Sequence, residues 1–124
     1  MLRNEKKKSK FTGQFYQVDA RIFDLSLKPI PFAVYSYLVF CAGHKRNCFP
    51  SVRTIAKSCC CSESSVREAI NELTARGLIS KEYCYRENRY GVRQQTSNNY
   101  HILPIPLYYE NGVPRYDYDN DLPF

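Results

Sequence analysis

Arg67 and Asn71 are the two residues of this chain whose side chains and spacing suggest the most specific chemistry. They lie four positions apart in a segment with helical periodicity, so both lie on one face of a helix. A guanidinium group can donate two hydrogen bonds to O6 and N7 of guanine, and a side-chain amide can pair with N6 and N7 of adenine. The pair therefore predicts a helix that reads base edges in the major groove of DNA.

The other polar side chains expected on this helix face leave two interpretations open. Ser64 is neutral, whereas Glu63 and Glu68 oppose a general attraction to DNA. The two carboxylates either accept hydrogen bonds from the amino group of cytosine or indicate that the face contacts a protein instead. Arg67 also lies four residues after Glu63, and an ion pair at that spacing stabilises a helix by only about 0.2–0.5 kcal/mol. A phosphate or a base could displace so weak a pair.

The segment from residue 62 to residue 77 has the features of a well-defined helix. Ser62 is a favourable N-cap residue, and Gly77 is favourable just after the last turn. One apolar face, at the spacing i, i+3, i+4 and i+7, is formed by Val66, Ala69, Ile70 and Leu73. With this arrangement the N-terminal N–H groups and the positive end of the helix dipole point outward, where they can meet an anion.

A shorter helix before residue 62 completes a helix-turn-helix motif. It opens at Pro50 and Ser51, and its Ala56 is the small residue needed where the two helices approach closely. Three consecutive cysteines form the turn, and Cys60 occupies the position where glycine is usual. Val66 locks the second helix onto the first. A left-handed backbone at Cys60 would cost about 1–2 kcal/mol.

The cysteines are not predicted to bind a metal. Structural zinc needs four convergent ligands, but the side chains of three consecutive residues diverge, and the other cysteines form no C-x₂-C pair. The chain has only two histidines. There is no secretory signal, and the apolar run 32–42 is too short to span a bilayer. We therefore expect reduced thiols in a cytoplasmic protein, with no metal, no cofactor and no membrane contact.

Two segments after Gly77 alternate between apolar and polar residues, as strands do. They cover residues 79–85 and 98–103, and the polar stretch 86–97 between them predicts a hairpin with a long loop, here called the wing. The loop contains four residues expected to contact the DNA backbone or the adjacent minor groove, Arg86, Asn88, Arg89 and Arg93. Solvated loop charges are the alternative interpretation.

The charge distribution also suggests a polyanionic partner. The net charge is +6, and the first ten residues carry five basic side chains against Glu5. Residues 104–124 instead hold one arginine against four acids. A basic body with a basic arm is typical of nucleic-acid binding, and a solubilising surface is the alternative. Three residues on or just before the first helix of the motif are suited to phosphate contacts, Ser51, Arg53 and Lys57.

The pattern as a whole predicts an α+β fold, a winged helix-turn-helix with a three-helix core and a two-stranded β wing. The first core helix is expected at residues 31–43, a short N-terminal strand is possible within 11–18, and a helical turn within 20–27. The C-terminal residues either form a flexible tail or pack their aromatic rings back onto the body. The expected domains are a basic flexible arm at 1–14, a winged-helix DNA-binding domain at 15–103 and an acidic, tyrosine-rich tail at 104–124.

Several runs of residues resemble the winged helix-turn-helix domain of plasmid, phage and other mobile-element proteins. They are VYSYL from residue 34, CFPSVRTIA from 48, SESSVREAINEL from 62, RGLI from 76 and TSNNYHI from 96. The chain is similar to the N-terminal domain of replication initiators of Gram-positive plasmids and, more distantly, to DnaD-like primosomal proteins. The resemblance implies a fold that is often dimeric and binds repeated double-stranded DNA sites. Cys60 departs from the family's turn glycine, and only about twenty residues follow the wing, where replication proteins normally carry a further domain.

Two functions of different classes are compatible with these features. The leading hypothesis is a non-enzymatic, sequence-specific double-stranded DNA-binding protein of a mobile element, acting in replication initiation or transcription control. The second is a protein-interaction module that docks a replication or regulatory partner without reading DNA. A homodimer fits either hypothesis. An enzyme is not expected, because no nucleophile–base pair, phosphate-binding loop or set of carboxylates converges in the sequence.

Overall fold

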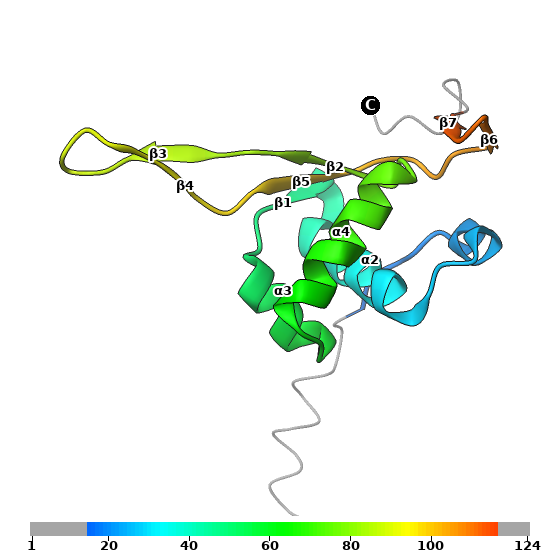
Figure 1. The fold of residues 1–124 in the computed structure, drawn as a ribbon. Helices are drawn as coiled ribbons and strands as arrows, with labels where there is room; N and C mark the ends of the chain where they lie inside the picture. The colour runs from blue at the N-terminus through cyan, green and yellow to red at the C-terminus, as the bar shows by residue number, and fades with distance from the viewer. Residues whose placement is uncertain (1–14, 117–124) are drawn as a thin grey trace, which may run out of the picture.

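The structure is a computed structural model that describes residues 15–116, and it has an α+β fold (Figure 1). Three helices pack against one face of a small antiparallel sheet, which confirms the expected fold class. The predicted basic arm, 1–14, and the end of the predicted tail, 117–124, lie outside the described residues. The elements are η1 (Ala20–Leu25), α2 (Pro29–Ala42), η2 (Gly43–Lys45), β1 (Asn47–Cys48), α3 (Val52–Cys59), α4 (Glu63–Ala75), β2 (Ile79–Glu82), β3 (Tyr85–Glu87), β4 (Arg93–Gln95), β5 (Asn99–Ile102), β6 (Tyr108–Glu110) and β7 (Val113–Arg115).

Helix α2 is the first helix of the core and contacts both α3 and α4. It begins with Pro29, whose fixed backbone angle and missing N–H suit the first turn of a helix. It ends where Gly43 takes a positive φ of 55°. The first core helix expected at residues 31–43 is thereby confirmed, with a start two residues earlier. The helical turn expected within 20–27 is the 3₁₀ helix η1.

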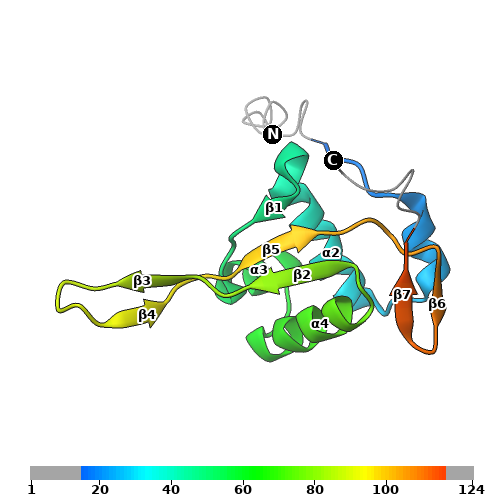
Figure 2. The same ribbon diagram turned by 90° about the horizontal axis from the view of Figure 1, so that it is seen from above.

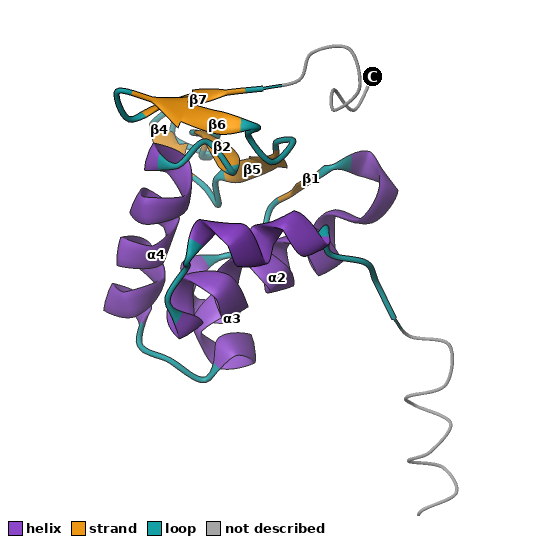
Figure 3. Cartoon of the chain, turned by 90° about the vertical axis from the view of Figure 1, so that its right-hand side faces the viewer, coloured by secondary structure: helices purple, strands orange, loops and turns teal. Residues whose placement is uncertain are grey.

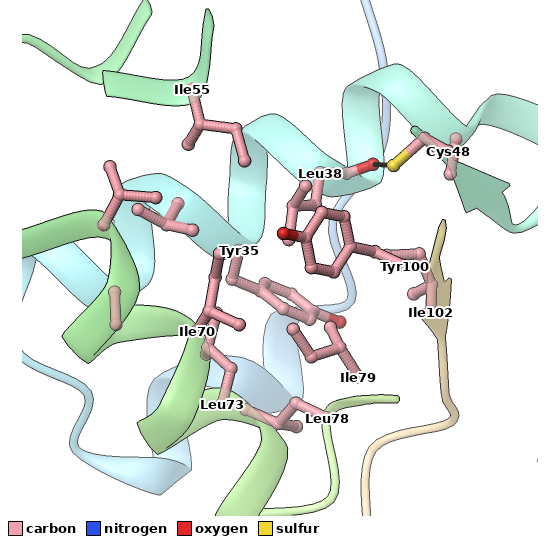
Figure 4. Close-up of a cluster of buried hydrophobic side chains, with 14 of the residues drawn as sticks. Tyr35, Leu38, Cys48, Ile55, Ile70, Leu73, Leu78, Ile79, Tyr100 and Ile102 are labelled. Atoms are coloured by element: carbon pink, nitrogen blue, oxygen red, sulfur yellow. Dashed lines mark hydrogen bonds between the residues drawn. The ribbon is translucent and has the colours of Figure 1, made fainter. Parts of the chain in front are cut away.

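The core lies between the three helices and the sheet (Figure 4). The rings of Tyr35 and Tyr100 lie among aliphatic side chains from all of these elements, and every predicted apolar-face residue of α4 is buried. Cys48 joins this core, and its thiol donates a hydrogen bond to the backbone oxygen of Leu38 at 3.6 Å. Burial raises the pKa of Cys48 to about 11, so this thiol stays protonated near neutral pH. All six cysteines are free thiols.

The sheet beside the helices has three antiparallel strands in the order β1–β5–β2 (Figure 2). Tyr100 of the central strand lies opposite Cys48 of β1 and opposite Lys81 of β2. The third strand therefore comes from residues 47–48, between η2 and α3. The predicted N-terminal strand is wrong for residues 15–18, which form no strand, and residues 11–14 lie outside the described part.

The wing continues beyond this sheet as an arm, residues 83–98, which projects away from the helices (Figure 1). The prediction that 86–97 is one long loop is wrong. Arg86 pairs with Gln94 in the β3–β4 ladder, and only 88–92 form the loop. All six residues of β3 and β4 are exposed, so backbone hydrogen bonds rather than a hydrophobic face hold the ladder. This explains why the apolar–polar pattern does not reveal these strands.

A bulge joins the arm to the sheet. Residues 83–84 separate the two ladders on the outgoing side, and residues 96–98 separate them on the return side. The extra residue breaks the ladder and bends the strand. Thr96 bridges the break, because both its N–H and its hydroxyl donate to the backbone oxygen of Cys84, at 2.8 and 3.2 Å. The hydrogen bonds between Thr96 and Cys84 therefore determine the direction in which the arm leaves the sheet.

The helix-turn-helix has the predicted turn. Cys60 takes the left-handed conformation with φ 56°, and the N–H groups of Cys60 and Cys61 donate to the backbone oxygen of Ala56. Ala56 and Val66 are both buried where α3 and α4 meet. Pro50, expected to open the first helix, instead lies just before the N-cap residue of α3.

The residues after the wing form a second hairpin that packs back onto the body. Strands β6 and β7 are joined by Asn111 and Gly112, both with positive φ, as a two-residue hairpin turn requires. The Tyr109 hydroxyl donates to the backbone oxygen of Arg76 at 2.8 Å. The Tyr116 hydroxyl donates to that of Gly77 at 2.5 Å. Of the two alternatives for the C-terminal residues, the described part follows the one in which aromatic rings pack back.

Gly77 has two reasons to be glycine. Its φ of 74° is a left-handed conformation at the end of α4. A Cβ atom there would also collide with Pro114 and with the Tyr116 hydroxyl. The C-terminal hairpin therefore packs against the chain where α4 ends.

Replacing Cys60 with glycine should stabilise the protein. The change removes left-handed strain of about 1–2 kcal/mol and adds about 0.5–1 kcal/mol of chain entropy to be lost on folding. We expect the free energy of unfolding, measured with urea, to rise by about 0.5–1 kcal/mol. Ser58→Gly, an exposed position inside α3, should lower it by a similar amount. A loss of stability in Cys60→Gly as large as that in Ser58→Gly would contradict the strained turn.

Tyr109→Phe should destabilise the protein by about 1 kcal/mol, because the backbone oxygen of Arg76 loses its partner while the ring stays in place. Tyr108→Phe is the matched control, since its side chain is exposed on the same strand and its hydroxyl has no hydrogen-bond partner among residues 15–116. Urea denaturation of both variants measures the difference. Equal stabilities would show that the hairpin is not held to α4 by this contact.

Candidate nucleic-acid interface

Two separate polar stripes run along the exposed side of α4. Arg67 and Asn71 line a cleft of about 300 Å³ together with Lys81 of β2 and Asn98 of the arm. The cleft floor is formed by three further residues, Val52, Ile70 and Tyr100. Arg67 and Asn71, which sequence periodicity predicts on one helix face, do lie together, and the Lys81 ammonium group of the wing lines the same cleft. Hereafter this feature is called the α4–wing cleft.

Glu68 faces a different groove. It lies with Ser65 and Glu72 beside the start of α2, at Lys28 and Pro29. Successive helix residues are rotated by 100°, so Glu68 is turned away from Arg67 although both are exposed. The acidic stripe therefore adjoins, but does not line, the α4–wing cleft.

Glu63 is the acid that reaches the reading face. Its carboxylate lies 3.5 Å from the Arg67 guanidinium, and the two side chains are 49% and 62% exposed. An ion pair this exposed contributes about 0.3–0.5 kcal/mol at most and is weakened by salt. The expected Glu63–Arg67 pair is confirmed, and it is weak enough for a ligand to displace. Ser64 is exposed near the start of the same helix.

Ser51 and Ser62 have a defined structural role at the two helix N-termini. The Ser62 hydroxyl oxygen accepts a hydrogen bond from the N–H of Ser65 at 3.0 Å. The Ser51 hydroxyl oxygen accepts one from the N–H of Thr54 at 3.1 Å. The predicted Ser62 cap is confirmed, and Ser51, predicted only as a phosphate contact, is the N-cap residue of α3. The hydroxyl groups hold the helices, while the positively polarised helix ends remain available to an anion. Arg53 and Lys57 of α3 are both exposed.

The arginines of the wing lie along the arm rather than within one loop. Arg86 and Arg93 are in strands, which corrects their predicted place in a loop, and Arg89 lies in the loop. The Arg93 guanidinium lies 4.5 Å from the ring centroid of Tyr85, a distance at which a cation and an aromatic face attract. Arg89 lies 5.9 Å from the Tyr90 ring in the same way. Each of these two arginines is thus paired with an aromatic ring on an arm whose strands bury no side chain.

Asn88 shapes the end of the arm. Its side-chain oxygen accepts hydrogen bonds from the N–H groups of Tyr90 and Val92, at 2.8 and 3.0 Å. Its backbone N–H donates to the oxygen of Val92, and its backbone oxygen accepts from Gly91. Asn88 is half-buried by these contacts. This predicted site residue therefore organises the loop that presents Arg89.

Sequence reasoning did not identify the polar cluster where the wing leaves the sheet. Glu82 Oε1 accepts from the Asn99 side-chain amide at 3.1 Å and lies 3.2 Å from His101 Nε2. Asn99 is buried and in turn accepts from the Asn47 amide at 3.2 Å. The hydrogen bonds from His101 and Asn99 hold the pKa of Glu82 below its usual value. The cluster fixes β2 to β5, and thus the cleft wall that carries Lys81.

Lys81 and Asn98 are also absent from the residues selected by sequence reasoning. Lys81 lies opposite Tyr100 in the β2–β5 ladder, so its place in the cleft follows from strand register. The alternation of the two strands indicates which residues share a sheet face, but it does not give the register. Asn98 lies in the bulge, where the alternation itself breaks.

The described part of the chain contains neither clustered metal ligands nor a membrane-spanning helix. Within residues 15–116, no three His, Cys, Asp or Glu side chains converge as metal ligands would. None of the helices seen there has the length and apolar character needed to cross a membrane. The helix pair with its turn, packed on an antiparallel sheet, defines a helix-turn-helix domain of the α+β type, consistent with a winged helix.

Residues 25–79 match the model of a protein family described as a helix-turn-helix domain. The match begins at the end of η1 and ends at the first residue of β2, so it includes α2, α3 and α4 but not the arm. No curated protein and no solved structure matches the chain. This segment is therefore a helix-turn-helix domain, which supports DNA as its partner.

Lowering the pH should remove the contribution of the Glu82 cluster to stability. Because the folded-state pKa of Glu82 is lowered, its contribution is present above the unfolded pKa of about 4.3 and is lost as the pH falls through the folded value. Glu82→Gln should therefore be less stable than the parent protein at pH 6, and this difference should shrink at pH 3. Urea denaturation at both pH values measures it. A difference independent of pH would mean that the carboxylate charge plays no part.

Proposed function

We propose that this protein binds double-stranded DNA sequence-specifically, with α4 in the major groove and the arm on an adjacent groove. The observation that carries the proposal is the α4–wing cleft, in which Arg67 and Asn71 lie beside Lys81 and Asn98. Two forked hydrogen-bonding groups one helical turn apart suit the edges of neighbouring base pairs. The helix-turn-helix match over 25–79 supports DNA as the partner.

The part of α4 from Glu63 to Asn71 is proposed to enter the groove. Ser64, Arg67 and Asn71 are exposed along one side of it, and the Ser62 cap leaves the positive helix end facing the phosphates. Glu63 releases Arg67 when a base competes, and its carboxylate is then placed to accept from a cytosine amino group. Glu68, on its separate stripe, is proposed to lie at the edge of the interface. Arg53 and Lys57 of α3 contact the backbone, which positions the protein but does not read sequence.

The arm is proposed to reach the neighbouring minor groove or its backbone. From Glu82 to Asn88 it spans six residues, or about 20 Å at about 3.3 Å per residue. The major groove is about 12 Å wide, so an arm of this length can extend past its edge. Arg86, Arg89 and Arg93 would then contact phosphates or the groove floor, and Tyr90 and Tyr85 lie beside two of them, Arg89 and Arg93.

The biological role that we propose is replication initiation or transcription control in a mobile element. The proposal rests on the runs of residues that resemble plasmid and phage replication initiators, including the Phe-Pro-Ser entry to α3 and the Thr-Ser-Asn entry to β5. Selecting the preferred site from a random pool of duplex oligonucleotides and reading its sequence tests the proposed role. Repeats within the selected site would agree with it.

Arg67→Ala should weaken binding to the selected duplex by about 1–3 kcal/mol and weaken binding to random duplex far less. Arg115→Ala is the charge-matched control, because this exposed arginine lies in the β6–β7 hairpin, at the opposite end of the molecule from the arm (Figure 2). Fluorescence anisotropy over a salt series measures both. The affinity of the parent protein should fall steeply with salt as phosphate contacts release counterions.

Two outcomes would contradict the proposal at different points. An equal loss for both duplexes in Arg67→Ala, matched by Arg115→Ala, would deny Arg67 a base-reading role. No affinity for duplex DNA even at low salt would remove the DNA function and leave a protein-interaction module as the explanation of the fold.

A further inference from the structure

A pocket of about 250 Å³ lies between α2 and the end of β5. Its walls come from the start of η1, from α2, from the turn between η2 and β1, and from residues 102–105. Pockets for drug-sized ligands usually measure about 300–1,000 Å³, so this one suits a smaller molecule. It shares no residue with the α4–wing cleft. Hereafter it is called the Tyr35 pocket.

The side chain after which the pocket is named is a buried tyrosine whose hydroxyl has no protein partner. Tyr35 is only 3% exposed, and its ring packs in the core (Figure 4). Its hydroxyl forms no hydrogen bond with residues 15–116. Every fully buried side-chain oxygen in that part of the chain does have a partner, so the Tyr35 hydroxyl reaches accessible space, which is the pocket. Because the hydroxyl of a buried tyrosine usually has a hydrogen-bond partner, this one points to a ligand.

The charged groups around Tyr35 show which wall its hydroxyl faces. Burial raises the pKa of Tyr35 above its usual value. The charge of Arg46 acts to lower this pKa, that of Asp19 to raise it and that of Arg21 to lower it. All three of these side chains line the pocket. The hydroxyl therefore lies toward the polar wall, beside two guanidinium groups and one carboxylate.

The charges on this wall do not cancel. Arg21 is held by Asp19, because its Nε donates to Oδ1 at 3.2 Å and its Nη2 to Oδ2 at 2.7 Å. Arg46 is exposed, and its guanidinium forms no ion pair or hydrogen bond with residues 15–116. The backbone of Arg46 is nevertheless fixed, since its oxygen accepts from the N–H of Ile102 at 2.8 Å. Among the described residues that line the pocket, one positive charge is therefore left for a ligand.

The rest of the pocket wall is largely apolar. It is formed mainly by Val39, Ile102, Pro104 and Ile105. A guanidinium group binds a carboxylate through two parallel hydrogen bonds, and a single positive charge matches a single negative one. A phosphate dianion carries more charge than this wall offsets, and burying an unpaired charge is costly. The pocket therefore has the chemistry of a site for a small acid with a compact apolar body.

We propose that the Tyr35 pocket binds a small monocarboxylate, whose oxygens accept hydrogen bonds from the Arg46 guanidinium and the Tyr35 hydroxyl. The apolar part of the ligand packs against Val39 and Ile105. The site is separate from the proposed DNA interface, and binding of the acid does not depend on DNA.

Titration of the ¹⁵N-labelled full chain with benzoate, followed by ¹H–¹⁵N NMR, tests the proposal. We expect saturable shifts of the signals of Tyr35, Arg46 and Ile105, with a dissociation constant of about 1 mM or less. Benzamide has the same ring and a similar shape but no charge, so it should bind at least about tenfold more weakly. Isobutyrate, an acid with a branched apolar body, should give the same pattern of shifts as benzoate. Inorganic phosphate should bind more weakly than either acid.

Substitutions separate the two proposed contacts. Arg46→Gln should raise the dissociation constant for benzoate at least about tenfold, because a hydrogen bond between charged groups is lost. Tyr35→Phe should raise it by about threefold or more, as expected for the loss of a weaker hydrogen bond. It should not lower the free energy of unfolding, since the hydroxyl has no protein partner. Lys45→Gln is the matched control, because Lys45 is exposed next to Arg46 but does not line the pocket. It should leave the dissociation constant unchanged.

Several results would overturn the proposal. One is the lack of saturable shifts at Tyr35, Arg46 and Ile105 with both acids. Another is benzamide binding as tightly as benzoate. Equal losses in Arg46→Gln and Lys45→Gln would indicate a general attraction of anions to a basic protein, and phosphate binding more tightly than benzoate would reject a monocarboxylate. Circular dichroism establishes that each variant is folded. Because no DNA is present, failure of this site and failure of DNA binding are separate results.

Discussion

The position of Tyr100 in the central strand is the constraint on which the rest of the structure depends. Its ring is 1% exposed between α2, α4 and the sheet, and its backbone pairs with β1 on one side and β2 on the other (Figure 4). Moving β5 by one residue would turn this ring to the opposite face of the sheet and open the core. The register that buries Tyr100 also places Lys81 in the cleft beside α4. Core packing and the geometry of the candidate interface are therefore set by the same strand.

The C-terminal hairpin reinforces this arrangement from the other end of the domain. It lies over the end of α4 (Figure 3), where the Tyr109 and Tyr116 hydroxyls donate hydrogen bonds to the backbone oxygens of the two residues that follow the helix. Because α4 carries Arg67 and Asn71, holding its C-terminal end limits how far the helix can tilt against the wing. A helix that reads bases needs such support, since small displacements of its axis move side chains out of hydrogen-bonding range.

The sequence predicts the helices well because each carries several signals that agree. The apolar face of α4, the Ser62 cap and Gly77 all indicate the same helix, and Arg67 and Asn71 follow from its periodicity. The arm is different: β3 and β4 bury nothing, so their pairing leaves no hydrophobic pattern. Strand β1 is too short to show a pattern at all. The C-terminal hairpin did carry a signal, since Asn111-Gly112 is a strong hairpin turn, but the acids and tyrosines around it suggested a tail.

The candidate site shows where periodicity reaches its limit. Helical periodicity groups Glu68 with Arg67 as exposed residues of one helix, yet the two side chains lie in different grooves. The reason is that the sheet packs beside α4 on one side and the start of α2 lies on the other. Only the packing of neighbouring elements decides which exposed stripe becomes a cleft wall. The same reasoning applies to α2, whose sequence is apolar on all sides and does not say which side faces the core. Packing assigns one face to Tyr100 and α4, and leaves part of the other accessible, as the exposed ring of Phe40 shows.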